Sequence, residues 1–290
     1  MPASPRTLIA GLAFAEGPRW HEGRLWLSDI AAGEVLAVDL GGRAEVIARV
    51  PFRPSGLGWL PPALGGDLLV VSMVDQRLLR LRERALEVVA DLSPWCGGHA
   101  NDMVVDARGR AYVGNLGFDL EAEPIDPRPT GIVRVDPDGR VRRVADGLMA
   151  PNGMVLSPDG ATLIAAESGG YRLVAFDVDA EGDLSEPREF AALPKGATPD
   201  GICLDAEGCV WAASPTTREF LRVREGGEVV RRVPAGGPEP ARTAIACMLG
   251  GPERRDLFLV TAATMIAGAV QARSARVDVL RVDVPGAGLP

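Results

Sequence analysis

The sequence predicts an all-β fold, a six-bladed β-propeller. The first observation is a recurring unit, in which a polar residue precedes a short apolar strand and a tight turn, as in Asn152 to Gly160. The second is the period, because Glu16, Asn101, Asn152 and Asp200 open four such units and lie 85, 51 and 48 positions apart. The third is the abundance of turn formers, since 35 Gly and 24 Pro fall between short apolar runs. A fixed period in this range, made of short strands, is typical of propellers.

The interval from Glu16 to Asn101 is about twice the others, so we expect it to contain one further unit. Residues 55–62 fit this unit, and residues 243–252 fit a sixth unit after Asp200. We expect four strands in each repeat. The expected first strands are Leu12 to Trp20, Ser55 to Leu60, Asp102 to Asp106, Gly153 to Ser157, Gly201 to Asp205 and Ile245 to Leu249.

The sixth repeat shows only three strands, and the segment Arg6 to Ala10 precedes the first repeat. We therefore expect this segment to be the outer strand of the last blade, where it closes the ring and removes an open edge. The run Leu8 to Ala15 is also similar to a short signal peptide. Its structural use favours a cytoplasmic protein that forms one propeller domain over 1–290. The run Ala262 to Ala272 can form one or two helical turns, and no stretch is long enough to span a membrane.

Composition excludes several classes of protein. The formal net charge is −8 and the basic residues are scattered, so no nucleic-acid partner is expected. The four cysteines show no Cys-x-x-Cys spacing, which argues against a zinc ribbon and favours free thiols in the cytosol. Neither a Gly-x-Ser-x-Gly elbow nor a phosphate-binding glycine loop is present.

Four residues are the candidate metal ligands. In a propeller, the first strand of every blade lines the central channel, so Glu16, Asn101, Asn152 and Asp200 are expected to point toward the axis. Two carboxylates and two amide oxygens suit hard cations such as Ca²⁺, Mg²⁺ or Mn²⁺. Asn and Asp are also common in turns for backbone reasons alone. The shared position in the repeat favours a metal site.

Other residues near this ring are candidates for catalysis. His99 precedes Asn101 by two positions and can bind substrate or move a proton, although a loop histidine without a role is an equal alternative. Asp102 is expected to support the strand start. The proline-rich segment Phe118 to Pro129 is either a surface excursion or a lid. We expect the chemistry on the side of the channel that His99 and this segment can reach.

A cation in the channel polarises a carbonyl or phosphoryl oxygen. A neighbouring carboxylate, Asp200 or Glu16, can act as general base or nucleophile. The combination predicts hydrolysis of a small ester-like bond.

The sequence resembles the gluconolactonase and senescence-marker-protein (regucalcin) family of six-bladed propellers over nearly its whole length. The matching segments are Glu16 to Trp20, Ser55 to Trp59, Asn101 to Asp106, Gly109 to Asn115, Pro151 to Met154, Pro199 to Ile202 and Ala246 to Pro252. The resemblance implies metal ligation by Glu16, Asn152 and Asp200, with Asn101 contacting a water on the metal or the substrate. It implies Asp200 as the base that opens a lactone, and one divalent cation, Ca²⁺ first, with Zn²⁺, Mn²⁺ and Mg²⁺ as alternatives.

One position departs from the family pattern. Many sugar-lactone members carry Arg two residues before the Asn, where it holds substrate hydroxyls, and this chain has His99. A smaller or more apolar lactone is therefore an alternative to a sugar lactone. An organophosphate hydrolase of the diisopropyl-fluorophosphatase type and a calcium-binding propeller without catalysis are the other hypotheses.

Overall fold

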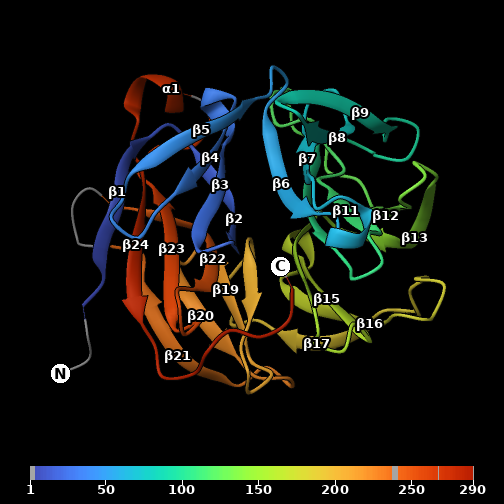
Figure 1. The fold of residues 1–290 in the computed structure, drawn as a ribbon. Coiled ribbons are helices and arrows are strands. Elements are labelled where there is room, and N and C mark those ends of the chain that lie inside the picture. The colour runs from blue at the N-terminus through green and yellow to red at the C-terminus, as the bar shows by residue number, and fades with distance from the viewer. Residues whose placement is uncertain (1–3, 237–240, 267, 290) are drawn as a thin grey trace.

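The computed structural model describes residues 4–236, 241–266 and 268–289. It contains six four-stranded antiparallel sheets arranged around a common centre (Figure 1). The innermost strand of each sheet contacts the innermost strands of its two neighbours, so these six strands form a closed ring. The predicted six-bladed propeller is confirmed.

The strands follow the chain blade by blade. Blade 1 contains β2 (Ala15–His21), β3 (Arg24–Asp29), β4 (Glu34–Val38) and β5 (Ala44–Arg49). Blade 2 contains β6 (Pro54–Trp59), β7 (Leu68–Ser72), β8 (Arg77–Arg82) and β9 (Ala85–Asp91). Blade 3 contains β10 (Ala100–Val105), β11 (Ala111–Asn115), β12 (Thr130–Val135) and β13 (Val141–Leu148).

Blade 4 contains β14 (Pro151–Leu156), β15 (Thr162–Glu167), β16 (Arg172–Asp177) and β17 (Arg188–Ala192). Blade 5 contains β18 (Ile202–Leu204), β19 (Val210–Ser214), β20 (Glu219–Val223) and β21 (Val229–Pro234). Blade 6 contains β22 (Thr243–Gly250), β23 (Asp256–Ala262), β24 (Ala275–Arg281) and β1 (Arg6–Leu12). The short helices are η1 (Ile30–Ala32), η2 (Pro62–Leu64), η3 (Ser168–Gly170) and α1 (Ala269–Ala272). None of the described helices is both long and apolar enough to cross a membrane.

The N-terminal strand closes the ring, as predicted. β1 pairs with β24, and the Thr7 hydroxyl donates a hydrogen bond of 2.7 Å to Asp278. The expected first strand of blade 1 was wrong at its start, because Leu12 belongs to β1 and β2 begins at Ala15. The reason lies in Asp29, whose carboxylate accepts the backbone N–H groups of Ala13 and Phe14 at 2.9 and 2.8 Å. These bonds fix the corner at which the chain leaves blade 6 for blade 1.

Apolar side chains fill the spaces between neighbouring blades. One cluster joins blades 4 and 5 through residues such as Val155 and Leu221, and another joins blades 2 and 3 through Val71 and Val113. The outer strand β13 of blade 3 carries mostly exposed or half-buried residues. This gradient is expected when sheets pack face to face around an axis and the outer strands meet solvent.

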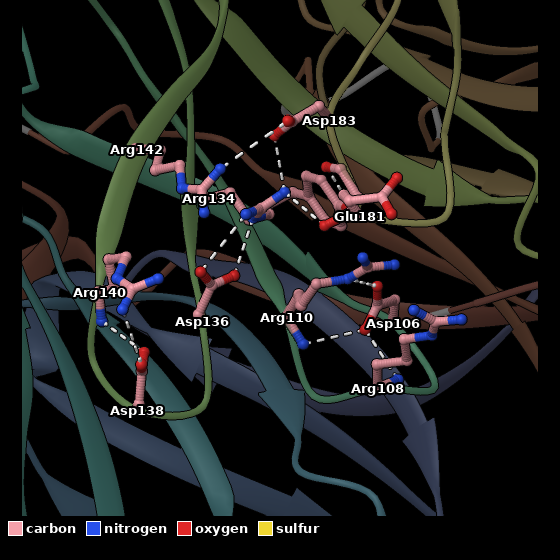
Figure 2. A network of polar contacts seen from close by, with 12 residues as sticks. Asp106, Arg108, Arg110, Arg134, Asp136, Asp138, Arg140, Arg142, Glu181 and Asp183 are labelled. Atoms are coloured by element: carbon pink, nitrogen blue, oxygen red, sulfur yellow. Dashed lines mark hydrogen bonds and ion pairs between the residues drawn. The ribbon is translucent and has the colours of Figure 1, made fainter.

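A polar network joins the outer parts of blades 3 and 4 (Figure 2). The Arg134 side chain is buried and lies 2.9 Å from Asp136 and 2.8 Å from Asp183, and it also donates to the Glu181 carbonyl at 2.7 Å. Asp106 and Arg110 form an adjacent ion pair of 2.5 Å. We call this set the blade 3–4 network. In it, each buried or half-buried carboxylate faces at least one guanidinium.

After β24 the chain, drawn in red in Figure 1, returns toward the middle of the ring and crosses one end of the channel. The Ala287 N–H donates to Leu204 at 2.9 Å, and Leu289 pairs with Leu156. Leu156 and Leu204 are the last residues of the inner strands β14 and β18. The segment therefore covers the end of the channel at which the inner strands finish.

Candidate metal centre

The first residues of the inner strands have a shared irregularity. The pairing register shifts after Pro54 in β6, after Ala100 in β10 and after Pro151 in β14. β-Bulges of this kind redirect a side chain and commonly lie beside functional sites. The residues that follow these positions, together with their counterparts in the other blades, form what we call the ring positions. They are Glu16, Ser55, Asn101, Asn152, Asp200 and Ile245.

The inner strands approach one another closely at this level. A Cβ atom on Gly153 would lie 2.6 Å from the backbone nitrogen of Ile202, and one on Gly201 would lie 2.3 Å from the Cβ of Ala246. Only glycine permits these two contacts, because a side chain at either position would force neighbouring blades apart. The close approach brings the ring positions of consecutive blades together.

The four predicted ligands all lie at ring positions. Glu16, Asn101 and Asn152 are buried, and Asp200 is half-buried just before β18. The other two ring positions are Ser55, whose hydroxyl donates to the Asn101 amide oxygen at 3.2 Å, and Ile245. Carboxylate or amide side chains therefore occupy the ring positions of four blades.

Two buried amide atoms at the ring lack partners among the described residues. They are the Asn152 Oδ1 and the Asn101 Nδ2. A buried polar atom without a hydrogen bond is costly, and such atoms call for an explanation such as an ion or a water. The unpartnered Asn152 oxygen is an atom that a hard cation can use. Rotating the Asn101 amide by 180° would present its oxygen instead and let its NH₂ group donate to Ser55.

The carboxylates at the ring are electrostatically unbalanced. Burial raises the pKa of Glu16 well above its usual value, and the charges of Asp200 and Asp102 raise it further, while Arg19 lowers it. Burial and the charge of Asp102 raise the pKa of Asp200 to about 8, against a hydrogen bond from Asn152. Three acidic groups thus share one guanidinium. A divalent cation would supply the positive charge that this arrangement lacks.

Amide oxygens are necessary parts of any cation site at the ring. Across 4–236, 241–266 and 268–289, no three His, Cys, Asp or Glu side chains converge to form a metal site by themselves. Glu16 and Asp200 need Asn101 and Asn152 to complete a shell of oxygens. Such an all-oxygen set fits Ca²⁺, Mg²⁺ or Mn²⁺ better than a soft metal.

A buried ion pair supports the ring, and sequence reasoning missed half of it. The Arg19 side chain is buried, lies 2.5 Å from Asp102, and donates to the carbonyls of Leu57, Pro18 and Met103 at 3.0, 2.9 and 2.8 Å. It therefore ties together the inner strands of blades 1, 2 and 3. Burial raises the pKa of Asp102, and Arg19 works against that rise. The sequence predicts that Asp102 supports the strand start, and it indicates no role for Arg19.

His99 lies outside the ring and contacts the loop at residues 117–129. Its Nε2 is 3.3 Å from Asp119, and the Leu120 N–H points to its Nδ1 at 3.5 Å. Its backbone N–H donates to the Phe118 carbonyl at 3.1 Å. Burial lowers the pKa of the imidazole, and Asp119 opposes that shift. His99 and this loop therefore lie together at the end of the channel where the inner strands begin.

Comparison with known proteins gives this architecture a family. Residues 14–263 match the family described as the SMP-30/gluconolactonase/LRE-like region. The chain belongs to this family. The match begins just before Glu16 and extends beyond the last inner strand, so it includes all six ring positions.

Characterised relatives include both enzymes and regucalcins. The chain is 27% identical over 285 residues to 6-deoxy-6-sulfogluconolactonase from Pseudomonas putida, covering 95% of this chain and 93% of the relative. It is 27% identical over 214 residues to regucalcin from Danio rerio, covering 71% and 68%. The structure of a calcium-binding protein, regucalcin, from Agrobacterium tumefaciens is superimposable with a TM-score of 0.80 at 22% identity, covering 100% of this chain and 97% of that chain. This last likeness supports the propeller fold.

Proposed function

We infer that the protein is a metal-dependent lactonase that opens a sugar lactone or a smaller lactone. The observation that carries this inference is the ring itself, in which Glu16, Asp102 and Asp200 share only Arg19 and the Asn152 amide oxygen has no described partner. The 6-deoxy-6-sulfogluconolactonase activity named for the Pseudomonas putida relative supports the same reaction.

The residues that would hold the metal are Glu16, Asn101, Asn152 and Asp200. Ca²⁺ is the first choice for their oxygens, and Zn²⁺, Mn²⁺ and Mg²⁺ are the alternatives. The calcium-binding description of the Agrobacterium tumefaciens protein supports a divalent cation. When bound, the cation would act as a Lewis acid toward the lactone carbonyl.

Asp200 is the proposed general base. It is less buried than the other acidic ring residue, Glu16, so a substrate at the channel mouth can reach it. With the cation bound, the Asp200 carboxylate would stay ionised, and an ionised carboxylate beside the lactone can take a proton from the attacking water. Asn101 and His99 lie in blade 3, on the same end of the channel, and are proposed to orient the lactone. The product is the open hydroxy acid, formed by addition of one water across the ester bond.

The proposed setting is the cytoplasm, with a small-molecule lactone or ester as the partner. The cysteines Cys96, Cys203, Cys209 and Cys247 are all free, which is usual for a reducing compartment. The net charge of −8 gives no support to a nucleic-acid partner.

The test is a comparison of turnover on two substrate classes. We expect the protein to hydrolyse D-glucono-1,4-lactone or a smaller lactone, and Asp200→Ala to lower kcat about 1,000-fold, as loss of a general base commonly does. Hydrolysis of diisopropyl fluorophosphate without lactone hydrolysis would identify the organophosphate alternative. Calcium binding with no turnover of either substrate above the Asp200→Ala rate would identify a non-catalytic propeller.

A further inference from the structure

One backbone position outside the ring recurs in four consecutive blades. It lies two residues before the ring position, and its carbonyl accepts the N–H of the residue that follows the second strand. The pairs are Phe14 with Ile30 at 2.8 Å, Arg53 with Met73 at 2.8 Å, His99 with Leu116 at 2.9 Å and Ala150 with Ser168 at 3.2 Å. Arg53 and His99 therefore occupy equivalent positions in adjacent blades, at the end of the channel where the inner strands begin.

Arg53 has hydrogen-bonding capacity that its surroundings do not use. Its Nη2 contacts the Glu121 carboxylate at 2.5 Å, whereas its buried Nη1 has no hydrogen-bond partner among the described residues. Arg19 differs, because its Nε, Nη1 and Nη2 all donate to protein oxygens.

The backbone of Arg53 has a left-handed conformation. Its φ of +67° lies in the left-handed region, which a residue with a long side chain seldom adopts. The conformation is held by the hydrogen bond from Met73 and by a bond of 3.2 Å from the Arg53 N–H to Val50. Ala150, at the equivalent position of blade 4, is also left-handed with a φ of +53°, so this conformation is a feature of the repeat.

The loop at residues 117–129 supplies acidic partners to both equivalent side chains. Glu121 contacts Arg53, and Asp119 contacts His99 at 3.3 Å. Both acids are exposed, with 58% and 56% of their side chains accessible. Exposed ion pairs are weak, so a better-placed anion can replace Glu121 at little cost.

We propose that Arg53 binds an anionic group on the substrate, such as a carboxylate or sulfonate carried by the lactone, and that Glu121 releases the guanidinium when this group arrives. The guanidinium fork offers two parallel donors to such a group, which a lysine or a neutral donor does not. The substrate class is then an acidic sugar lactone rather than a neutral one. This inference rests on the proposed lactonase function.

The test uses two lactones that differ at one carbon. D-Glucaro-1,4-lactone carries a carboxylate where D-glucono-1,4-lactone carries a hydroxymethyl group. We expect Arg53→Ala to raise KM for the glucaro compound about 10- to 100-fold, as loss of a charge-assisted hydrogen bond does, and to leave the neutral compound nearly unchanged. Glu121→Gln is expected to lower KM for the glucaro compound, because it removes the competing carboxylate.

The control is Arg49→Ala, which removes the same charge from an exposed side chain paired with Glu34 on blade 1. This control should leave the KM of both lactones unchanged. Equal losses on both lactones in Arg53→Ala would show a loop clamp and overturn the inference, as would no loss on either. Calorimetric binding of both lactones to the Asp200→Ala protein separates this question from catalysis. A selective loss of glucaro-lactone affinity on adding Arg53→Ala would support the anion site even if the wild-type protein turned over neither lactone.

Discussion

The blade 3–4 network and the ring of the central channel use the same kinds of side chain in opposite ways. In the network, Arg134 lies between Asp136 and Asp183, and Arg110 faces Asp106, so positive and negative groups are matched (Figure 2). At the ring, burial and the charges of Asp200 and Asp102 raise the pKa of Glu16, and among the described residues only Arg19 opposes this rise. The network is complete in itself, whereas the ring lacks positive charge.

The difference indicates what each region does. Matched ion pairs at the outer edge hold two blades in register and require nothing else. Unmatched buried carboxylates destabilise the empty fold, and a protein retains them where a ligand supplies the compensation. The imbalance at the ring is therefore the physical argument for a cation, independent of any relative.

The largest effect is expected from removing the single guanidinium at the ring. Arg19→Met leaves the buried Asp102 carboxylate without its partner, so the free energy of unfolding should fall by about 3–5 kcal/mol. Urea denaturation of the metal-free protein measures this change. A decrease smaller than about 1 kcal/mol would show that Arg19 is not needed to hold the acidic ring together.

A pH dependence is the next expected effect. The pKa values of Glu16, Asp102 and Asp200 are raised in the folded protein, so their contribution to stability is complete below the unfolded values, near pH 4, and is lost as the pH rises through the folded ones. The pKa of Asp200 in the folded protein is about 8. The Tm of chelator-treated protein should therefore fall between pH 5 and pH 8, and saturating Ca²⁺ should reduce that fall. Asp200→Asn should flatten the profile of the metal-free protein, and an unchanged slope in this variant would contradict the assignment.

The smallest effect is expected at the edge of the blade 3–4 network. Arg142 is exposed, and its Nη1 lies 3.9 Å from the equally exposed Asp183. Arg142→Ala should change the free energy of unfolding by less than about 0.5 kcal/mol, because solvent screens such a pair. The same denaturation series tests this, and a loss comparable to that of Arg19→Met would remove the contrast between the two regions.

The repeat could be predicted from the sequence, because its signals lie within short segments of the chain. Four inner strands carry a carboxylate or amide residue at the ring position, and their spacing located the other two strands, so the period revealed six blades and placed Glu16, Asn101, Asn152 and Asp200 at equivalent positions. The closing strand was predictable by elimination, since blade 6 lacked one strand. The corner at Asp29 was not, because it depends on hydrogen bonds from Ala13 and Phe14 across the start of blade 1.

The contacts between distant blades could not be read from the sequence. Arg19 meets Asp102 across 83 positions, and Arg53 meets Glu121 across 68. Each pairing depends on how neighbouring inner strands stack around the axis and on where a long loop returns. Nothing local to Arg19 or Arg53 distinguishes either residue from the other arginines of the chain.

The central claim is that the ring binds one divalent cation, and calcium titration tests it most directly. Chelator-treated protein would be titrated calorimetrically with Ca²⁺ as wild type, as Glu16→Gln and as the control Glu22→Gln, whose side chain is 81% exposed in the turn after β2. The account predicts one ion per chain for wild type and for Glu22→Gln, and binding at least about tenfold weaker for Glu16→Gln, since a ligating charge is lost. Unchanged stoichiometry and affinity in Glu16→Gln would contradict it.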